Sequence, residues 1–259
     1  MKKLAFSVFA AALTFGANAA ESVETAPAAS ESCCGYDGFY FGLGIAGVNG
    51  GIKTETTDAY VGRQRWNREI GVDSDDSDTK FAGSLTLGYG RRIQEKAYIG
   101  LEAGLDATKN SNFVHAGNMS TSPRQWEVYS KVNGLTPSVA LKLGYVHPGT
   151  RGMVYLKAGA AYSVAKANYT ENDLVIGKDF PYSKKVSKWS PIIALGGEKL
   201  CGKNIRTRLE VEYKFKTNGK VDFNNGLDPA DPDYYNGTVK VTNKDSVTLR
   251  AMAVYTVRM

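Results

Sequence analysis

The sequence predicts an all-β protein, a transmembrane, eight-stranded, antiparallel up-and-down β-barrel. Three observations lead to this fold class. Segments of about ten residues alternate between bulky apolar residues and small or polar ones, the connections between these segments alternate between long and short, and charged residues gather on the face that carries the glycines. Helical periodicity is absent, and after residue 20 no apolar run approaches the about 20 residues that a helical span needs.

The composition excludes two other classes of protein. With 42% hydrophobic and 11% aromatic residues, the chain has too much apolar surface to remain disordered. The net charge is +6 from 32 Lys+Arg and 26 Asp+Glu, and it falls to +4 without Lys2 and Lys3. A charge this small and dispersed gives no reason to expect a nucleic-acid partner.

The first nineteen residues have the three-part pattern of a secretory signal peptide. Lys2 and Lys3 form the basic start, residues 4–15 are apolar, and the segment ends in the small residues Ala17-Asn18-Ala19. We expect cleavage after Ala19 and export of the chain. Residues 20–37 have no periodicity, and the Ala/Ser/Glu-rich part of this segment suits a flexible periplasmic leader.

The alternating segments are the expected barrel strands. In the first, Phe39 and Phe41 share one face while Tyr40 and Gly42 share the other. Pro191 makes the sixth segment less regular than the rest. The eight expected strands are 38–48, 81–90, 97–107, 136–146, 154–165, 189–199, 205–216 and 247–259.

The connections between these strands predict the orientation of the barrel, which spans residues 38–259. Outer-membrane barrels have short periplasmic turns and longer extracellular loops, whereas a soluble meander has no reason for such asymmetry. The three short connections are 91–96, 147–152 and 200–204. Four long extracellular loops are expected at 49–80, 108–135, 166–188 and 217–246.

The two faces of the strands predict which side chains meet lipid and which fill the lumen. The lumen of an eight-stranded barrel is just wide enough to be filled by side chains, so glycines and paired charges suit the inside and the bulky apolar residues suit lipid. We expect Glu102 to pair with Lys142, and Arg250 to pair with Glu210 or Glu212. A narrow or gated conduit is the alternative to a plugged lumen. The expected lumen ion pairs involve Glu102, Lys142, Lys157, Arg208, Glu210, Glu212 and Arg250, and the inward set also includes Asp106, Glu198 and Arg206.

Short motifs in this pattern resemble a known family. The segments Gly-Phe-Tyr-Phe-Gly at 38–42, Leu-Thr-Leu-Gly-Tyr at 85–89 and Leu-Lys-Leu-Gly-Tyr at 141–145 are similar to those of eight-stranded outer-membrane β-barrels of the opacity-protein and outer-membrane-protein-A transmembrane-domain type. The chain ends in Met259, whereas the family usually ends in an aromatic residue that the barrel-assembly machinery reads. No peptidoglycan-binding domain is expected after the last strand.

The resemblance implies an integral protein in the outer membrane of a Gram-negative bacterium, monomeric and multi-pass, with a structural, surface-contact or adhesion role. The implied partners are outer-membrane lipid and lipopolysaccharide, the barrel-assembly machinery through the C-terminal strand, and a host or surface ligand at the loops. The alternatives are an outer-membrane enzyme acting on lipid A, a narrow-conductance porin, and a soluble exported ligand-binding barrel.

The sequence contains few residues that could form an active site or a metal site. His115 is expected in a long loop and His147 in a short turn, away from a serine and carboxylate on one strand face, although Ser111 or Ser120 lies near His115 in sequence. The acidic segment 73–78 lacks the fixed glycine and terminal glutamate of a calcium loop. The sequence therefore predicts no enzyme, no catalytic residues, no cofactor and no metal.

Basic and aromatic residues interleave in the first long loop. Arg63, Arg65, Trp66 and Arg68 have the chemistry to contact lipopolysaccharide phosphates near the outer leaflet. The alternative is a charged hairpin that extends above the membrane without a ligand.

Three cysteines make an odd set in an oxidising compartment. Cys33, Cys34 and Cys201 are all expected on the periplasmic side. A disulfide from Cys33 or Cys34 to Cys201 would tie the leader across the periplasmic mouth. A Cys33–Cys34 bridge and free thiols remain the alternatives.

Overall fold

The computed structural model describes residues 34–61, 64–66, 76–93, 96–108, 111–118, 124–132, 134–147, 149–173, 178–224 and 235–257. No helix within these ranges is long and apolar enough to cross a membrane. The elements are the 3-10 turn η1 (Cys34–Tyr36) and the strands β1 (Gly38–Val61), β2 (Gln64–Trp66), β3 (Asp76–Ile93), β4 (Ala97–Thr108), β5 (Ser111–Asn118), β6 (Arg124–Val132), β7 (Leu135–His147), β8 (Gly152–Asp173), β9 (Lys178–Leu200), β10 (Ile205–Lys214), β11 (Thr217–Asn224), β12 (Tyr235–Asn243) and β13 (Ser246–Val257).

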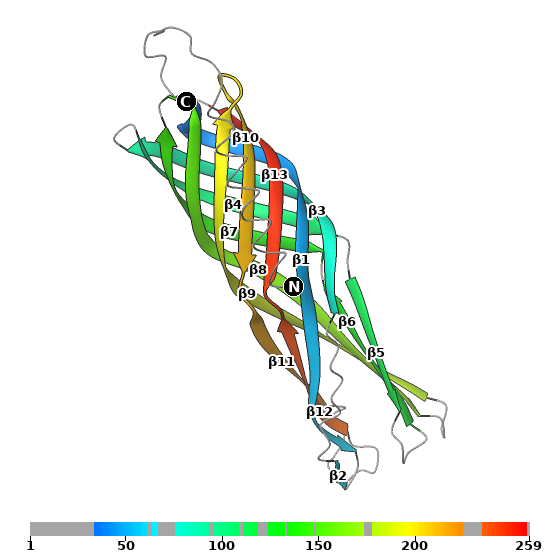
Figure 1. Ribbon diagram of the computed structural model, residues 1–259. Helices are drawn as coiled ribbons and strands as arrows, with labels where there is room; N and C mark the ends of the chain where they lie inside the picture. Colours follow the sequence, from blue (N-terminus) through cyan, green and yellow to red (C-terminus); the bar gives the residue numbers. More distant parts are fainter. Residues whose placement is uncertain are drawn as a thin grey trace.

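Eight of these strands close into an antiparallel barrel. The sheet runs in the order β1-β13-β10-β9-β8-β7-β4-β3, and β3 pairs back with β1 from Gly38↔Gly90 to Ile52↔Asp76. Each barrel strand contains one of the alternating segments expected from the sequence. Two expected strands differ at their ends: residues 215–216 follow β10, and residues 258–259 lie outside the described residues. The all-β, eight-stranded up-and-down barrel is therefore confirmed, and Figure 1 shows its tilted strands.

The burial of the strands follows the alternation of the sequence. In β1, Ile45 is 70% exposed on the outside while its neighbour Ala46 is 2% exposed inside. In β13, Leu249 lies outside and Arg250 inside. An apolar outside and a charged inside are the reverse of a soluble barrel, which excludes the soluble alternative. This arrangement is that of a transmembrane β-barrel of the outer-membrane type, and the predicted location in the outer membrane is confirmed.

Aromatic side chains lie at both ends of the apolar outside. At the end that carries the short turns, Phe39 and Tyr89 have ring centroids 4.9 Å apart. At the opposite, long-loop end, Tyr162 packs against Trp189 at 5.2 Å and Tyr213 packs against Phe215 at 4.9 Å. Amphipathic rings at two heights match the two membrane–water interfaces.

Beyond the long-loop end, several strands continue out of the barrel as ribbons. β8 and β9 pair without interruption from Gly152↔Lys199 to Asp173↔Lys178, although the sequence suggested a connection at 166–188. β5 and β6 add to the β8 side, while β11 and β12 add to the β1 side. Figure 1 shows these ribbons projecting from one end of the barrel.

Pro191 determines where the barrel wall ends between β9 and β10. Phe215 donates its N–H to the Pro191 carbonyl at 3.0 Å, but proline has no N–H to return the bond. The ladder therefore stops at Ile192↔Lys214, and the chain starts a new strand, β11, at Thr217. The expected strand 205–216 is accordingly too long by two residues.

Candidate functional site

Ten charged side chains form ion pairs in the described part of the lumen, and they come from six of the eight barrel strands. These ten comprise five cations and five anions, and Lys214, on the same inward face of β10 as Glu212, adds one further cation at the long-loop end. Tyr40 of β1 and Ser84 of β3 bond to members of the set, so that all eight strands contribute to the lumen. The cations are Lys142, Lys157, Arg206, Arg208 and Arg250, and the anions are Glu102, Asp106, Glu198, Glu210 and Glu212.

Glu198 is the centre of the half of the lumen nearest the short turns. Lys142 Nζ donates to Glu198 Oε1. Arg208 Nε donates to the same oxygen at 2.7 Å, and Arg206 NH1 lies 2.8 Å from Glu198 Oε2. The side chains of all four residues have 0% exposure. One carboxylate therefore holds three buried cations.

Glu102 connects this half of the lumen to the other. Its Oε2 accepts from Arg208 NH1 at 2.7 Å and from the Tyr40 hydroxyl at 2.9 Å. Its Oε1 lies 3.4 Å from Lys157 Nζ. The expected pairing of Glu102 with Lys142 is corrected, because Lys142 lies opposite Gly100, two residues closer to the short-turn end, and reaches across to Glu198.

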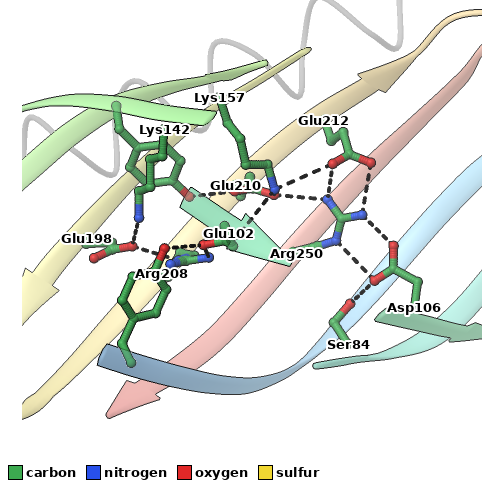
Figure 2. A network of polar contacts seen from close by, with 12 residues as sticks. Ser84, Glu102, Asp106, Lys142, Lys157, Glu198, Arg208, Glu210, Glu212 and Arg250 are labelled. Carbon is green, nitrogen blue, oxygen red and sulfur yellow. Dashed lines mark hydrogen bonds and ion pairs between the residues drawn. The ribbon is translucent and has the colours of Figure 1, made fainter. Parts of the chain in front are cut away.

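Arg250 organises the half of the lumen nearest the long loops. Its NH1 lies 3.0 Å from both Glu210 Oε1 and Glu212 Oε2, and its NH2 donates to Asp106 Oδ2 at 2.5 Å. The expected partners Glu210 and Glu212 are thus both present. Lys157 Nζ also donates to Glu210 at 2.6 Å, and Figure 2 shows the continuous network from Lys142 to Asp106.

The paired charges explain how a barrel can keep so much charge inside. Burying an ion costs several kcal/mol of desolvation free energy. This cost is offset only if the ion contacts an opposite charge and makes further hydrogen bonds. Here each carboxylate meets at least one cation, and Tyr155 donates to Glu210 Oε2 at 2.7 Å as an additional bond. The arrangement fills the lumen with fixed ion pairs.

Tyr36, in the segment just before β1, caps the short-turn mouth of the lumen. Tyr36 is 0% exposed, and its hydroxyl donates to the Arg151 carbonyl at 2.9 Å. Its ring packs edge-on against Tyr98, with centroids 6.5 Å apart, and lies 5.1 Å from the Arg206 guanidinium. Arg206 also lies 5.1 Å from the Tyr40 ring, so the guanidinium contacts two aromatic rings.

The residues on either side of Tyr36 hold this cap in place. The Gly35 carbonyl accepts from Thr256 Oγ1 at 2.9 Å, and a Cβ at Gly35 would lie 2.3 Å from Leu200 Cδ2. Asp37 Oδ2 accepts from the Arg92 guanidinium at 2.9 Å and 3.0 Å. Tyr36 precedes the alternating segments, so periodicity gives no signal for it, whereas Tyr40, Tyr98 and Tyr155 all lie at inward positions that the alternation marks.

The structure brings the segment just before β1 next to the turn that carries Cys201. Gly35 packs against Leu200, one residue before Cys201, and Cys34 begins η1. Cys201 is an exposed free thiol in the structure, while Cys33 and the side chain of Cys34 lie outside the described residues. The disulfide therefore remains a prediction.

The other candidate residues of the sequence lie in or near the ribbons. Arg65 and Trp66 belong to β2, where Trp66 pairs with Ala59, but their side chains lie outside the described part of the chain, as do Arg63 and Arg68. The lipopolysaccharide contact there remains a prediction. His115 lies in β5, with its side chain likewise outside the described part, and His147 ends β7 as an exposed residue.

Comparison with known proteins identifies no family for the chain, because no family model and no curated protein matches it. Similar solved structures exist at low identity. The outer membrane protein OprG from Pseudomonas aeruginosa is 16% identical, covers 86% of this chain and 98% of its own, and has a TM-score of 0.45. Ail, the attachment invasion locus protein of Yersinia pestis, is 14% identical over 85% of this chain and 99% of its own, with a TM-score of 0.39. The outer membrane protease OmpT of Escherichia coli is 12% identical over 91% and 100%, with a TM-score of 0.46.

Proposed function

We propose that this outer-membrane barrel is a non-enzymatic anchor with a plugged lumen, and that it presents its β-ribbons to surfaces outside the cell in a contact or adhesion role. The fold alone does not set this role, because similar barrels host different activities. The proposal draws on two features of this chain, the filled lumen and the length of the ribbons.

The length of the strands is the observation that carries the proposal. A transmembrane β-strand needs about 9–11 residues. β1, β8 and β9 have 24, 22 and 23 residues. In β9, residues 178–188 lie beyond the aromatic Trp189, which at about 3.3 Å per residue extends the strand by about 36 Å. A protein that only had to cross the membrane would not need these extensions.

The lumen supports an anchoring role over transport. The ten charges neutralise one another inside a barrel of only eight strands, and Tyr36 covers the short-turn mouth. A solute that crossed would have to separate buried ion pairs, and breaking such a pair costs about 3–5 kcal/mol. The ribbons, rather than the lumen, are therefore the part that meets the surroundings.

Attachment of cells tests this role. The full chain is expressed in a Gram-negative strain without adhesins, and adherence to a cultured epithelial monolayer and settling of cell suspensions are measured. The comparison variant replaces residues 113–130, 169–182 and 219–241 by Asn-Gly turns, which close the hairpins at the pairs Asn112↔Lys131, Asn168↔Ser183 and Asn218↔Thr242. We expect several-fold more attachment with the full chain than with the trimmed chain or the empty strain.

Two controls make the result decisive. Lys203→Gln alters the exposed short turn at the opposite end and is expected to leave attachment unchanged. Heat-modifiable gel mobility and outer-membrane abundance show that each variant is folded and present. Equal attachment by the trimmed chain, or none above the empty strain with a folded full chain, would contradict the proposed role.

A further inference from the structure

The three short turns of the barrel carry a surplus of positive charge. Together, the turns 91–96, 147–152 and 200–204 contain five Lys and Arg residues and one acidic residue, Glu95. Each turn places at least one cation at an exposed position. We name one such side chain from each turn the basic rim; its members are Lys96, Arg151 and Lys203.

Arg151 has a backbone conformation that disfavours arginine. Its φ is 51°, in the left-handed region where glycine and asparagine cost less. This conformation aims its carbonyl at two donors, the Tyr36 hydroxyl at 2.9 Å and the Leu200 N–H at 3.0 Å. Glycine could present the same carbonyl at a lower cost, so the presence of arginine points to a use for its charge at this turn.

The segment just before β1 is already bound to this end of the barrel. Asp37 accepts from the Arg92 N–H at 2.7 Å and from the Arg92 guanidinium at 2.9 Å and 3.0 Å. A Cβ at Gly35 would lie 3.1 Å from the Lys203 carbonyl oxygen. One carboxylate of the N-terminal chain is thus already paired with an arginine of a short turn, and the chain reaches this interface beside Lys203.

Residues 20–33, which precede this bound segment, have the opposite charge. They contain Glu21, Glu24 and Glu31 and no Lys, Arg, His or Asp. Five basic residues in the three turns, less Glu95 and Asp37, leave +3 against −3 for residues 20–33. The two sets of charges are equal in number and opposite in sign, so they attract one another.

The length of the chain keeps these glutamates near the rim. Glu31 is four residues before Gly35, so the two Cα atoms are at most about 14 Å apart. Glu21 is fourteen residues before Gly35, and a flexible chain of that length has an r.m.s. end-to-end distance of about 20 Å. The Debye length is about 8 Å at physiological ionic strength, so the nearest glutamate stays within about two Debye lengths of the interface.

We propose that residues 20–33 dock on the basic rim through Glu21, Glu24 and Glu31, and that this contact straps Tyr36 into the short-turn mouth of the lumen. Tyr36 is 0% exposed, and its ring lies 5.1 Å from the Arg206 guanidinium. Docked residues hold the chain just before Tyr36, so their release lets the ring leave the mouth. The contact uses only the short-turn end and is independent of the contact role proposed for the ribbons.

Paramagnetic relaxation in the folded protein tests the docking. The full chain, in the form isolated from outer membranes, is placed in phosphatidylcholine nanodiscs, with Cys33, Cys34 and Cys201 replaced by serine. A nitroxide on Thr150→Cys, at an exposed residue beside Arg151, relaxes the amide protons of residues 20–33 when these lie on the rim.

Three variants are compared with this chain. The rim variant carries Lys96→Gln, Arg151→Gln and Lys203→Gln. The segment variant carries Glu21→Gln, Glu24→Gln and Glu31→Gln. The control variant removes three exposed lysines at the long-loop end through Lys185→Gln, Lys216→Gln and Lys220→Gln.

The relaxation of residues 20–33 is expected to fall at least about threefold in the rim and segment variants, and equally in the unaltered chain when NaCl rises from about 20 mM to about 500 mM. The control variant is expected to match the unaltered chain. Equal relaxation in the unaltered chain and the rim variant, or an equal loss in the control variant, overturns the docking. Loss of the relaxation in phosphatidylglycerol nanodiscs at low salt also overturns it, because the rim would then take anionic lipid headgroups.

The position of Tyr36 is measured separately, with 3-fluorotyrosine at this site alone. The unaltered chain is expected to give one ¹⁹F signal from a buried ring, and the segment variant a second signal from a ring in water. A ¹⁹F spectrum that stays the same in the segment variant and at high salt overturns the strap. Heat-modifiable gel mobility shows that each variant is folded.

Discussion

Replacing Glu198 by glutamine is expected to destabilise the folded barrel by about 3–5 kcal/mol, because the change leaves three buried cations without their shared carboxylate. Lys142, Arg206 and Arg208 all contact this side chain, and none has an exposed side chain. Reversible urea unfolding in lipid vesicles, followed by heat-modifiable gel mobility, measures the free energy of unfolding.

A second substitution separates the charge effect from a loss of packing. Arg206→Met removes one of the three cations, so the double variant with Glu198→Gln restores the net charge of the unaltered lumen. We expect the double variant to be less destabilised than the sum of the two single changes, with a coupling energy of about 1–3 kcal/mol. The substitution Lys96→Met, at an exposed short turn, is expected to change stability by less than about 0.5 kcal/mol. Additive effects at Glu198 and Arg206 would contradict the ion-pair network.

Placing an arginine at Leu141 is expected to cost about 2–4 kcal/mol, because the site lies on the outside of the barrel near the middle of β7. Leu141 is 45% exposed and pairs with Leu101 on one side and Ala158 on the other. In a soluble protein the same exposed leucine would accept an arginine with little change. Urea unfolding in vesicles measures the loss, and the folded fraction at zero denaturant confirms that the variant still inserts.

The matched control for this change is Ile205→Arg. Ile205 is exposed on the same outer surface but begins β10 at the short-turn end, beside Tyr255. Near a membrane interface an arginine costs only about 0–1 kcal/mol. A loss at Ile205 as large as at Leu141, or no loss at either position, would be incompatible with a lipid-facing belt.

The alternation of the sequence was sufficient to predict the barrel strands and their two faces. Period-2 patterning marks which side chains share a face, so Leu249 and Arg250 were correctly placed outside and inside. The same patterning does not mark the height of a side chain in the lumen, which depends on register. For this reason the pairing of Glu102 with Lys142 was wrong, while Arg250 with Glu210 and Glu212 was right.

Two further features depend on contacts that a local pattern cannot encode. Tyr36 lies before the first strand, and its place in the lumen follows from its bonds to residues more than a hundred positions away, such as Arg151. The ribbon strands β5, β11 and β12 contain several Gly and Asn residues, which are depleted in strands. The end of the β9–β10 ladder, in contrast, has a local cause in the sequence, because Pro191 has no N–H to continue the ladder.

The most direct test of the account is the environment of single nitroxide labels along β7 in lipid vesicles. Cysteine replaces Val139, Ala140, Leu141, Lys142 and Leu143 one at a time, in a background where Cys33, Cys34 and Cys201 are serine. Labels at 139, 141 and 143 are expected to be relaxed by oxygen, which dissolves in lipid, and shielded from a water-soluble nickel chelate. Labels at 140 and 142 are expected to be shielded from both, because these sites are buried in the filled lumen. Ready access of the nickel chelate to 139, 141 and 143, or equal oxygen access at all five sites, would contradict a membrane barrel with an apolar outside and a plugged, charged inside.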